Sequence, residues 1–212
     1  MQYRTFIFSP FQENTYLLYD ETKACVIVDP GNFSPNENEQ LDAFIENNQL
    51  KPEYIIQTHN HLDHLFGAYY VAQKYKIPLA CHADEIPWIK NFKATCAGYG
   101  LNMETEPPMP QHQFIDGELF KFGSTELHVI FVPGHSAGGL AFYNKASGLL
   151  FCGDILFENS IGRTDLPGGN YNLLIKGIKE KILTLPDETR VFSGHGPSTT
   201  IGKEKMNNPF LH

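Results

Sequence analysis

Long hydrophobic runs are missing from this 212-residue sequence, and positive charge is scarce. No apolar segment approaches the roughly 20 residues that a membrane-spanning helix needs, so we expect no membrane insertion. Lysine and arginine number 16 against 24 acidic residues, which gives a formal net charge of -8. This acidic balance disfavours nucleic acid and anionic membranes as partners.

Cysteine is also scarce, and the spacing of the cysteines indicates neither a metal site nor a redox pair. The four cysteines, Cys25, Cys81, Cys96 and Cys152, are far apart and form no CxxC pair. We therefore expect reduced thiols rather than a disulfide framework. The opening segment, MQYRTFIFSPFQENTY, lacks the apolar centre of a secretory signal. Together these features predict a cytoplasmic protein.

The rest of the composition is typical of a globular protein. Hydrophobic residues make up 42% of the chain, aromatic residues 13% and charged residues 19%. These values exclude a disordered chain, a coiled coil and a fibrous repeat. The length predicts a single domain covering residues 1–212, with a sizeable core.

Strand and helix patterns alternate along the chain. Ser34-Pro35-Asn36-Glu37 has the serine cap, early proline and later glutamate that are typical of a helix start. The stretch 94–111 holds three prolines and no clear period, so we expect a loop there. The remaining predicted strands are 14–19, 24–28, 54–56, 77–81, 118–122, 125–132, 139–143, 148–152 and 189–193, and the other helices are 65–75, 83–92 and 171–185. This mixed order predicts α/β layers around sheets that contain hairpins.

Histidine is concentrated in one short segment, THNHLDH, that directly follows a predicted strand. It offers His59, His61, Asp63 and His64 as candidate metal ligands. A loop can bring these side chains together, whereas one face of a regular helix cannot. Imidazole and carboxylate suit zinc, iron or manganese, and the lack of thiolate argues against a structural zinc site.

Three more candidate ligands each follow an apolar strand pattern. His135 lies in HVIFVPGHSAGG, Asp154 ends GLLFCGD, and His195 lies in RVFSGHG. With the first cluster they are too many for one tetrahedral ion. They suit two ions that share a carboxylate and lie about 3.5–4 Å apart. The other histidines have no ligand partner at plausible spacing and are predicted to be structural or surface residues: His82, His112, His128 and His212.

These motifs resemble those of the metallo-β-lactamase fold superfamily, and within it the glyoxalase II (hydroxyacylglutathione hydrolase) group. The resemblance runs from Asp29-Pro30-Gly31 through THNHLDH, PGHSAGG and CGD to GHGPST. It implies an α/β fold, a four-layer αββα sandwich with the metal site at one edge of the two sheets. It also implies hydrolysis of a thioester such as S-lactoylglutathione to a hydroxy acid and a free thiol.

The same resemblance implies roles for the ligands. His59, His61 and His135 would hold the first divalent ion, and Asp63, His64 and His195 the second, with Asp154 bridging them. Zinc is the expected metal, and iron or manganese is the alternative. Asp63 is also the catalytic candidate, because its carboxylate can accept a hydrogen bond from the attacking hydroxide and orient it.

Arg163, in IGRTDLPGG, lies where glyoxalase II enzymes carry a basic residue that contacts glutathione. The family often has an aromatic residue two positions later, and here that position is Asp165. Few residues follow His195, so the C-terminal helical extension that holds glutathione in longer members is expected to be missing. We therefore expect loose recognition of the carrier thiol, with Arg163 as its main charged contact.

Other activities remain open at this point. A mononuclear iron persulfide dioxygenase would use His59, His135 and Asp154, and such enzymes tend to carry the GRTD string found at 162–165. The GHGPST ending favours a hydrolase. A lactonase and a tRNA-processing nuclease are weaker alternatives, and a non-catalytic metal-binding module would not need a complete ligand set.

Overall fold

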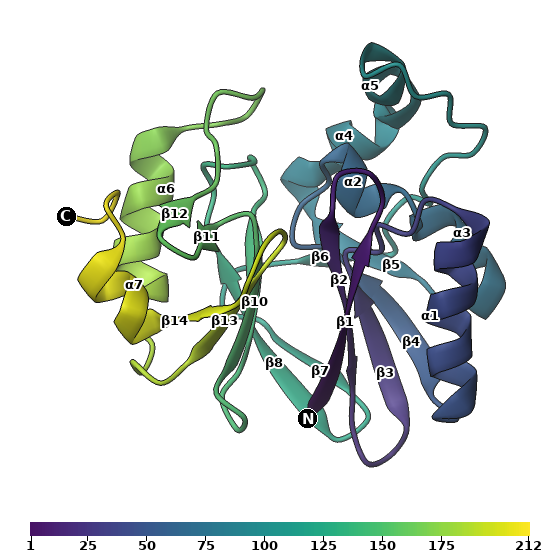
Figure 1. Cartoon of the computed structure of the whole chain (residues 1–212), viewed down its shortest axis with the longest axis horizontal. Helices are drawn as coiled ribbons and strands as arrows, with labels where there is room; N and C mark the ends of the chain where they lie inside the picture. The colour runs from purple at the N-terminus through teal and green to yellow at the C-terminus, as the bar shows by residue number, and fades with distance from the viewer.

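Two six-stranded sheets face one another across the centre of the protein (Figure 1). The computed structural model describes residues 1–212. Sheet A contains, in spatial order, β1 (Gln2–Phe8), β2 (Glu13–Tyr19), β3 (Ala24–Val28), β4 (Lys51–Ile56), β5 (Leu79–His82) and β6 (His112–Phe114). Sheet B contains β14 (Thr199–Thr200), β13 (Arg190–Ser193), β10 (Leu149–Gly153), β9 (Leu140–Asn144), β8 (Thr125–Phe131) and β7 (Leu119–Phe122). A separate ribbon pairs β11 (Leu156–Phe157) with β12 (Ser160–Ile161).

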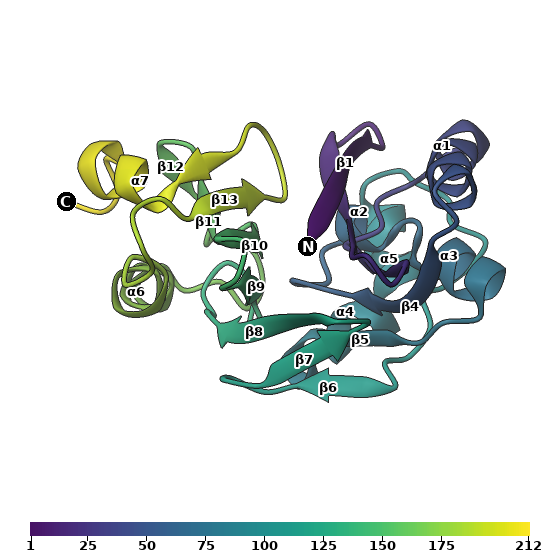
Figure 2. The same ribbon diagram turned by 90° about the horizontal axis from the view of Figure 1, so that it is seen from below.

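Helices flank the pair of sheets on both outer sides, as the two views show (Figures 1 and 2). On the side of sheet A are α1 (Pro35–Asn47), α2 (Leu62–Leu65), α3 (Ala68–Tyr75), the 3₁₀ turn η1 (Ala83–Glu85), α4 (Ile86–Lys90) and α5 (Phe92–Gly98). On the side of sheet B are α6 (Tyr171–Gly177), the π-helix η2 (Ile178–Ile182) and α7 (Ile201–Asn207). The predicted αββα sandwich is confirmed.

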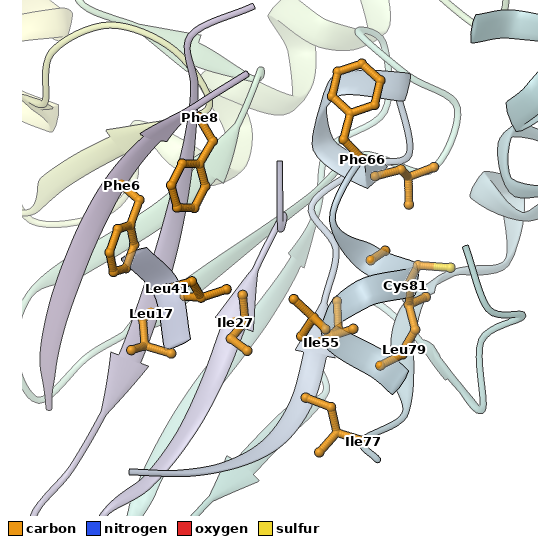
Figure 3. Close-up of a cluster of buried hydrophobic side chains, with 14 of the residues drawn as sticks. Phe6, Phe8, Leu17, Ile27, Leu41, Ile55, Phe66, Ile77, Leu79 and Cys81 are labelled. Atoms are coloured by element: carbon orange, nitrogen blue, oxygen red, sulfur yellow. The ribbon is translucent and has the colours of Figure 1, made fainter. Parts of the chain in front are cut away.

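The strand alternation divides the apolar side chains of sheet A between two core layers. In β3, Cys25 and Ile27 face the helices, whereas Val26 and Val28 face sheet B. Figure 3 shows Ile27 next to Leu41 of α1 in the outer layer. Both faces of β3 are covered, so every one of its residues is buried.

Sheet B is divided in the same way. Phe142 and Phe151 point into the layer between the sheets, and Leu150 lies under the C-terminal helices with Leu174. The ring of Phe142 lies 5.3 Å from that of Phe114 on β6, measured between centroids. Aromatic rings from the two sheets therefore meet in the central layer.

Helix α1 begins as its sequence predicts. The Ser34 hydroxyl accepts a hydrogen bond from the Glu37 amide, and the Glu37 carboxylate accepts one from the Ser34 amide. This reciprocal pair satisfies backbone donors that the first turn leaves free.

The prediction of a loop over 94–111 is wrong at its start, because α5 continues to Gly98. Phe92 and Cys96, one helical turn apart, are both buried against the outer core of sheet A. Tertiary burial thus stabilises a short helix that local sequence does not signal. The predicted helices 83–92 and 171–185 are each divided, the first into η1 and α4 and the second into α6 and η2. Strands β1 and β6 and helix α7 had no clear local signal and were not predicted.

All four cysteines are free and buried, as expected for reduced thiols. Their pKa values are raised by burial, and that of Cys152 rises to about 12. None of the helices has both the length and the apolar character needed to cross a bilayer.

The aromatic contact between the sheets gives a prediction about stability. Phe142→Ala should lower the free energy of unfolding by about 3–5 kcal/mol, because the cavity lies in a layer that both sheets enclose. Urea unfolding followed by circular dichroism measures this change. Leu119→Ala, at a side chain that is 49% exposed on β7, is the control and should cost about 0.5 kcal/mol or less. Equal losses in the two variants would contradict the prediction.

Candidate metal centre

Strand direction brings the predicted ligands to one edge of the sandwich. Strands β3, β4 and β5 are parallel neighbours, and β8, β10 and β13 also run in one direction within sheet B. The carboxyl ends of parallel strands lie at the same edge of a sheet. The segment with His59 follows β4, and His135, Asp154 and His195 follow the three strands of sheet B.

The two sheets are connected directly at this edge. The Asn14 amide at the start of β2 donates to the Gly194 carbonyl at 2.7 Å. The Asn14 side chain donates to the carbonyls of Ser193 and Gly196. These bonds fix the segment around His195 against sheet A.

His59, His61 and His135 form the first group of candidate ligands. The Nε2 atom of His135 lies 3.2 Å from His59 Nε2 and 2.9 Å from His61 Nδ1. Nitrogen ligands at about 2.1 Å from a tetrahedral ion lie roughly 3.4 Å apart, so this spacing fits one metal ion. Burial lowers the pKa of all three imidazoles, that of His61 to about 3. Neutral imidazole is the form that binds a metal.

Asp63, His64 and His195 form the second group. The Asp63 carboxylate lies 3.1 Å from His195 Nε2 and 3.9 Å from His64 Nε2. The Nε2 atom of His64 is buried and has no hydrogen-bond partner. A buried polar atom without a partner is unfavourable, and a metal ion would satisfy it.

Asp154 lies between the two groups, as a bridging ligand requires. One carboxylate oxygen is 3.6 Å from His64 Nε2, and the other is 3.6 Å from His135 Nε2 and 3.8 Å from His195 Nε2. The first of these oxygens is also buried without a hydrogen-bond partner. The donor set therefore fits two divalent ions that share this carboxylate.

Gly194 allows this close approach. A Cβ atom at that position would lie 2.2 Å from an Asp154 carboxylate oxygen and 2.6 Å from His64 Cε1. Any side chain there would displace the carboxylate of Asp154 or the ring of His64.

Asp29 also lies close to His59 and His64, with candidate ligand atoms within 4.8 Å of one another, but it has another role. The Asp29 carboxylate accepts hydrogen bonds from the Thr58 amide at 2.7 Å and from the Thr58 hydroxyl at 2.5 Å. It also accepts one from His64 Nδ1 at 3.1 Å. With its oxygens engaged, Asp29 orients the histidine segment and fixes which nitrogen of His64 faces the second group. In the sequence, Asp29 stood out only as part of the Asp29-Pro30-Gly31 motif, with no role assigned to its side chain.

Glu85 is a positioning residue that the sequence did not reveal. Its fully buried carboxylate accepts hydrogen bonds from the amides of Asn60 at 2.8 Å and Gly138 at 2.7 Å, and from the Ser136 hydroxyl. Asn60 lies between two ligands of the first group, and Ser136 follows the third. One carboxylate thus joins the ligand loops of the two sheets. Glu85 follows β5 at the same edge, but HADEIPW matches no recognisable motif.

Arg163 lies beside the ligand cluster, and its backbone and its side chain make different contacts. Its backbone carbonyl accepts a hydrogen bond from His135 Nδ1 at 2.8 Å, which leaves Nε2 of that ring for a metal. Its guanidinium group is exposed and pairs with Asp165. Four further histidines were predicted to be structural or surface residues. They all lie outside the ligand groups: His82, His112, His128 and His212.

Comparison with known proteins agrees with this geometry. A family model described as the Metallo-beta-lactamase superfamily matches residues 8–195. The chain belongs to the metallo-β-lactamase superfamily. The resemblance found in the sequence motifs is therefore confirmed.

Two curated relatives of this superfamily match almost the whole chain. A probable metallo-hydrolase, YqgX of Bacillus subtilis, is 38% identical over 100% of this chain and 98% of the relative. The hydroxyacylglutathione hydrolase GloC of Haemophilus influenzae is 34% identical over 95% of this chain and 94% of the relative. These relatives support a metal-dependent hydrolase.

Two solved structures have the same fold over nearly their full length. BLEG-1, a B3 metallo-beta-lactamase, is 37% identical with a TM-score of 0.88, and the match covers 99% of each chain. TTHA1623, in a di-iron-bound form, is 36% identical with a TM-score of 0.88, over 98% of this chain and 100% of the other. The superfamily binds divalent metals, and the His/Asp cluster suits them.

The position of Asp154 predicts its effect on metal binding. Asp154→Ala should reduce the metal content of dialysed protein from two ions per chain and weaken both sites, because one carboxylate faces both groups. Elemental analysis and calorimetric titration measure this. Asp116→Ala, which removes a surface carboxylate paired with Lys181, should retain the metal content. Retention of both ions by Asp154→Ala would show that Asp154 is only a turn residue.

Glu85→Gln tests the connection between the ligand loops. The amide can no longer accept all three hydrogen bonds, so the affinity of the first group for zinc should fall about tenfold or more. Competition with a chromophoric chelator measures the affinity. Glu118→Gln, at a carboxylate bonded to His112, is the control. Lower stability with unchanged zinc affinity would limit Glu85 to a role in folding.

Proposed function

We propose that this protein is a dinuclear metal-dependent hydrolase that cleaves small thioesters, such as S-lactoylglutathione, to a hydroxy acid and a free thiol. The observation that carries the proposal is the cavity at the sheet edge, of about 480 Å³, onto which both ligand groups open. It is lined by His61, Asp63, His135, Asp154 and His195. Its volume suits a small organic substrate.

The chemistry of the cavity favours a thioester as the substrate. No lysine, cysteine or serine lines it, so no covalent nucleophile of those types is available. A departing thiol has a pKa near about 8.5 and needs little protonation, so the reaction does not require a separate general acid. The 34% identity to a hydroxyacylglutathione hydrolase supports the same substrate class.

Asp63 would orient the attacking water. When bound, the two ions lower the pKa of water toward about 7 and polarise a carbonyl oxygen. Although burial opposes ionisation, the imidazoles of His64 and His195 hold the pKa of Asp63 below its usual range. Asp63 is therefore an ionised acceptor at neutral pH, and it lines the cavity.

The walls of the cavity position the rest of the substrate. The indole of Trp88 packs edge-on against the ring of His61, with centroids 4.7 Å apart. Phe11, Tyr99 and Leu166 add apolar surface, and Arg163 contributes a cation. We assign the wall beside Arg163 to the thiol arm of the substrate.

Zinc is the proposed resident ion, because the donor set is all imidazole and carboxylate. Iron is the alternative, since TTHA1623 has been crystallised with two iron ions. We also propose a cytoplasmic location, which the four free thiols support.

The substrate class is tested with a panel on one metal-analysed preparation. We expect thioester hydrolysis, detected by thiol release, to exceed lactone and β-lactam hydrolysis, with two zinc ions per chain. A single ferrous ion with oxygen uptake on a glutathione persulfide would instead identify a persulfide dioxygenase. Metal binding without turnover of any substrate would contradict an enzymatic function.

Asp63→Asn separates metal binding from the orientation of water. The amide keeps the size of the side chain but is a weaker acceptor and ligand. We expect kcat for thioester hydrolysis to fall by at least about a hundredfold while the first group keeps its ion. Metal titration and thiol release on the same sample measure both effects. A kcat near that of the unmodified enzyme would exclude Asp63 from catalysis.

A further inference from the structure

The guanidinium group of Arg163 is already paired. Its Nε atom donates to one carboxylate oxygen of Asp165, and its Nη2 atom donates to the other, both at 2.7 Å. This is the two-point geometry with which arginine binds any carboxylate. The edge of Arg163 that would hold a carboxylate-bearing substrate is therefore occupied by a residue of the same chain.

No second basic side chain is available along the cavity. Arg163 is the only lysine or arginine among the cavity-lining residues. A neighbouring groove of about 380 Å³ shares Trp88, Thr95 and Pro167 with the cavity, and it contains Asp84 but no basic residue. Its remaining walls are formed by Pro87, Asn91, Ala137 and Gly168. The lining of the cavity's wall and of this groove therefore offers a thiol arm neutral or acidic side chains, apart from one paired arginine.

We propose that Asp165 is a specificity-determining residue, which occupies Arg163 and biases the enzyme toward thioesters whose thiol arm carries no net negative charge. This inference rests on the proposed thioesterase function. The fitting substrate class is an acyl thioester of a neutral thiol, with its arm along the groove beside Trp88.

The electrostatic reason is a competition between carboxylates. An anionic arm must either displace Asp165 from Arg163 or lie beside an unfavourable like charge. Arg163 and Asp165 are 59% and 68% exposed, so solvent screens the pair and the effect is modest. A neutral arm meets no such competition.

Two substrates with the same acyl group test the proposal: one on glutathione, which has two carboxylates and one ammonium group, and one on uncharged N-acetylcysteamine. Asp165→Asn should raise the ratio of kcat/KM for the glutathione ester over the neutral ester by about fivefold, chiefly through KM. The gain should shrink with added salt.

Arg163→Ala in the Asp165→Asn background should remove the gain, because the freed guanidinium causes it. Arg163→Ala in the unmodified enzyme should change the ratio by less than about twofold. Asp187→Asn is the matched control: it removes one carboxylate from the exposed pair with Lys205, and it should leave the ratio unaltered.

An unaltered ratio in Asp165→Asn would overturn the inference. A gain that persists without Arg163, or that Asp187→Asn reproduces, would overturn it as well, because net charge would then be the cause. If the zinc-loaded unmodified enzyme hydrolyses neither ester, the proposed function itself fails. Hydrolysis of both esters with no effect of Asp165 overturns only the specificity role.

Discussion

Three imidazole nitrogens that converge inside the protein are the constraint on which the rest of the site depends. His135 donates its Nδ1 proton to a carbonyl, so its Nε2 faces His59 and His61 with a bare lone pair. Away from water, these three nitrogens could together serve as ligands of one cation. Asp29 orients His64 in a comparable way. A backbone carbonyl and a carboxylate therefore orient His135 and His64, respectively.

Hydrogen bonds between the two sheets hold the candidate ligands close together. On one side, Glu85 joins the loop of Asn60 to that of Ser136. On the other side, Asn14 joins β2 to the segment that follows β13. Both connections cross from sheet A to sheet B. The central aromatic layer fixes the separation of the sheets, and these polar contacts fix their edge.

The features that could be predicted from the sequence are those set by residues close together along the chain. The cap at Ser34, most strands and the THNHLDH cluster are local, and the predicted ligands do lie together. Glu85 and α5 were not predictable in this way, because their roles come from partners far away in sequence. The pairing of Arg163 with Asp165 is local, yet the sequence alone did not indicate it, because an exposed loop allows many side-chain arrangements.

Each ligand group takes members from both halves of the chain. His59 and His61 require His135, and Asp63 and His64 require His195, so each group joins one ligand loop of sheet A to one of sheet B. Neither group is complete in a chain in which only sheet A has folded. Tight metal binding would therefore follow the packing of the two sheets, and a bound ion would in turn hold the sheets together.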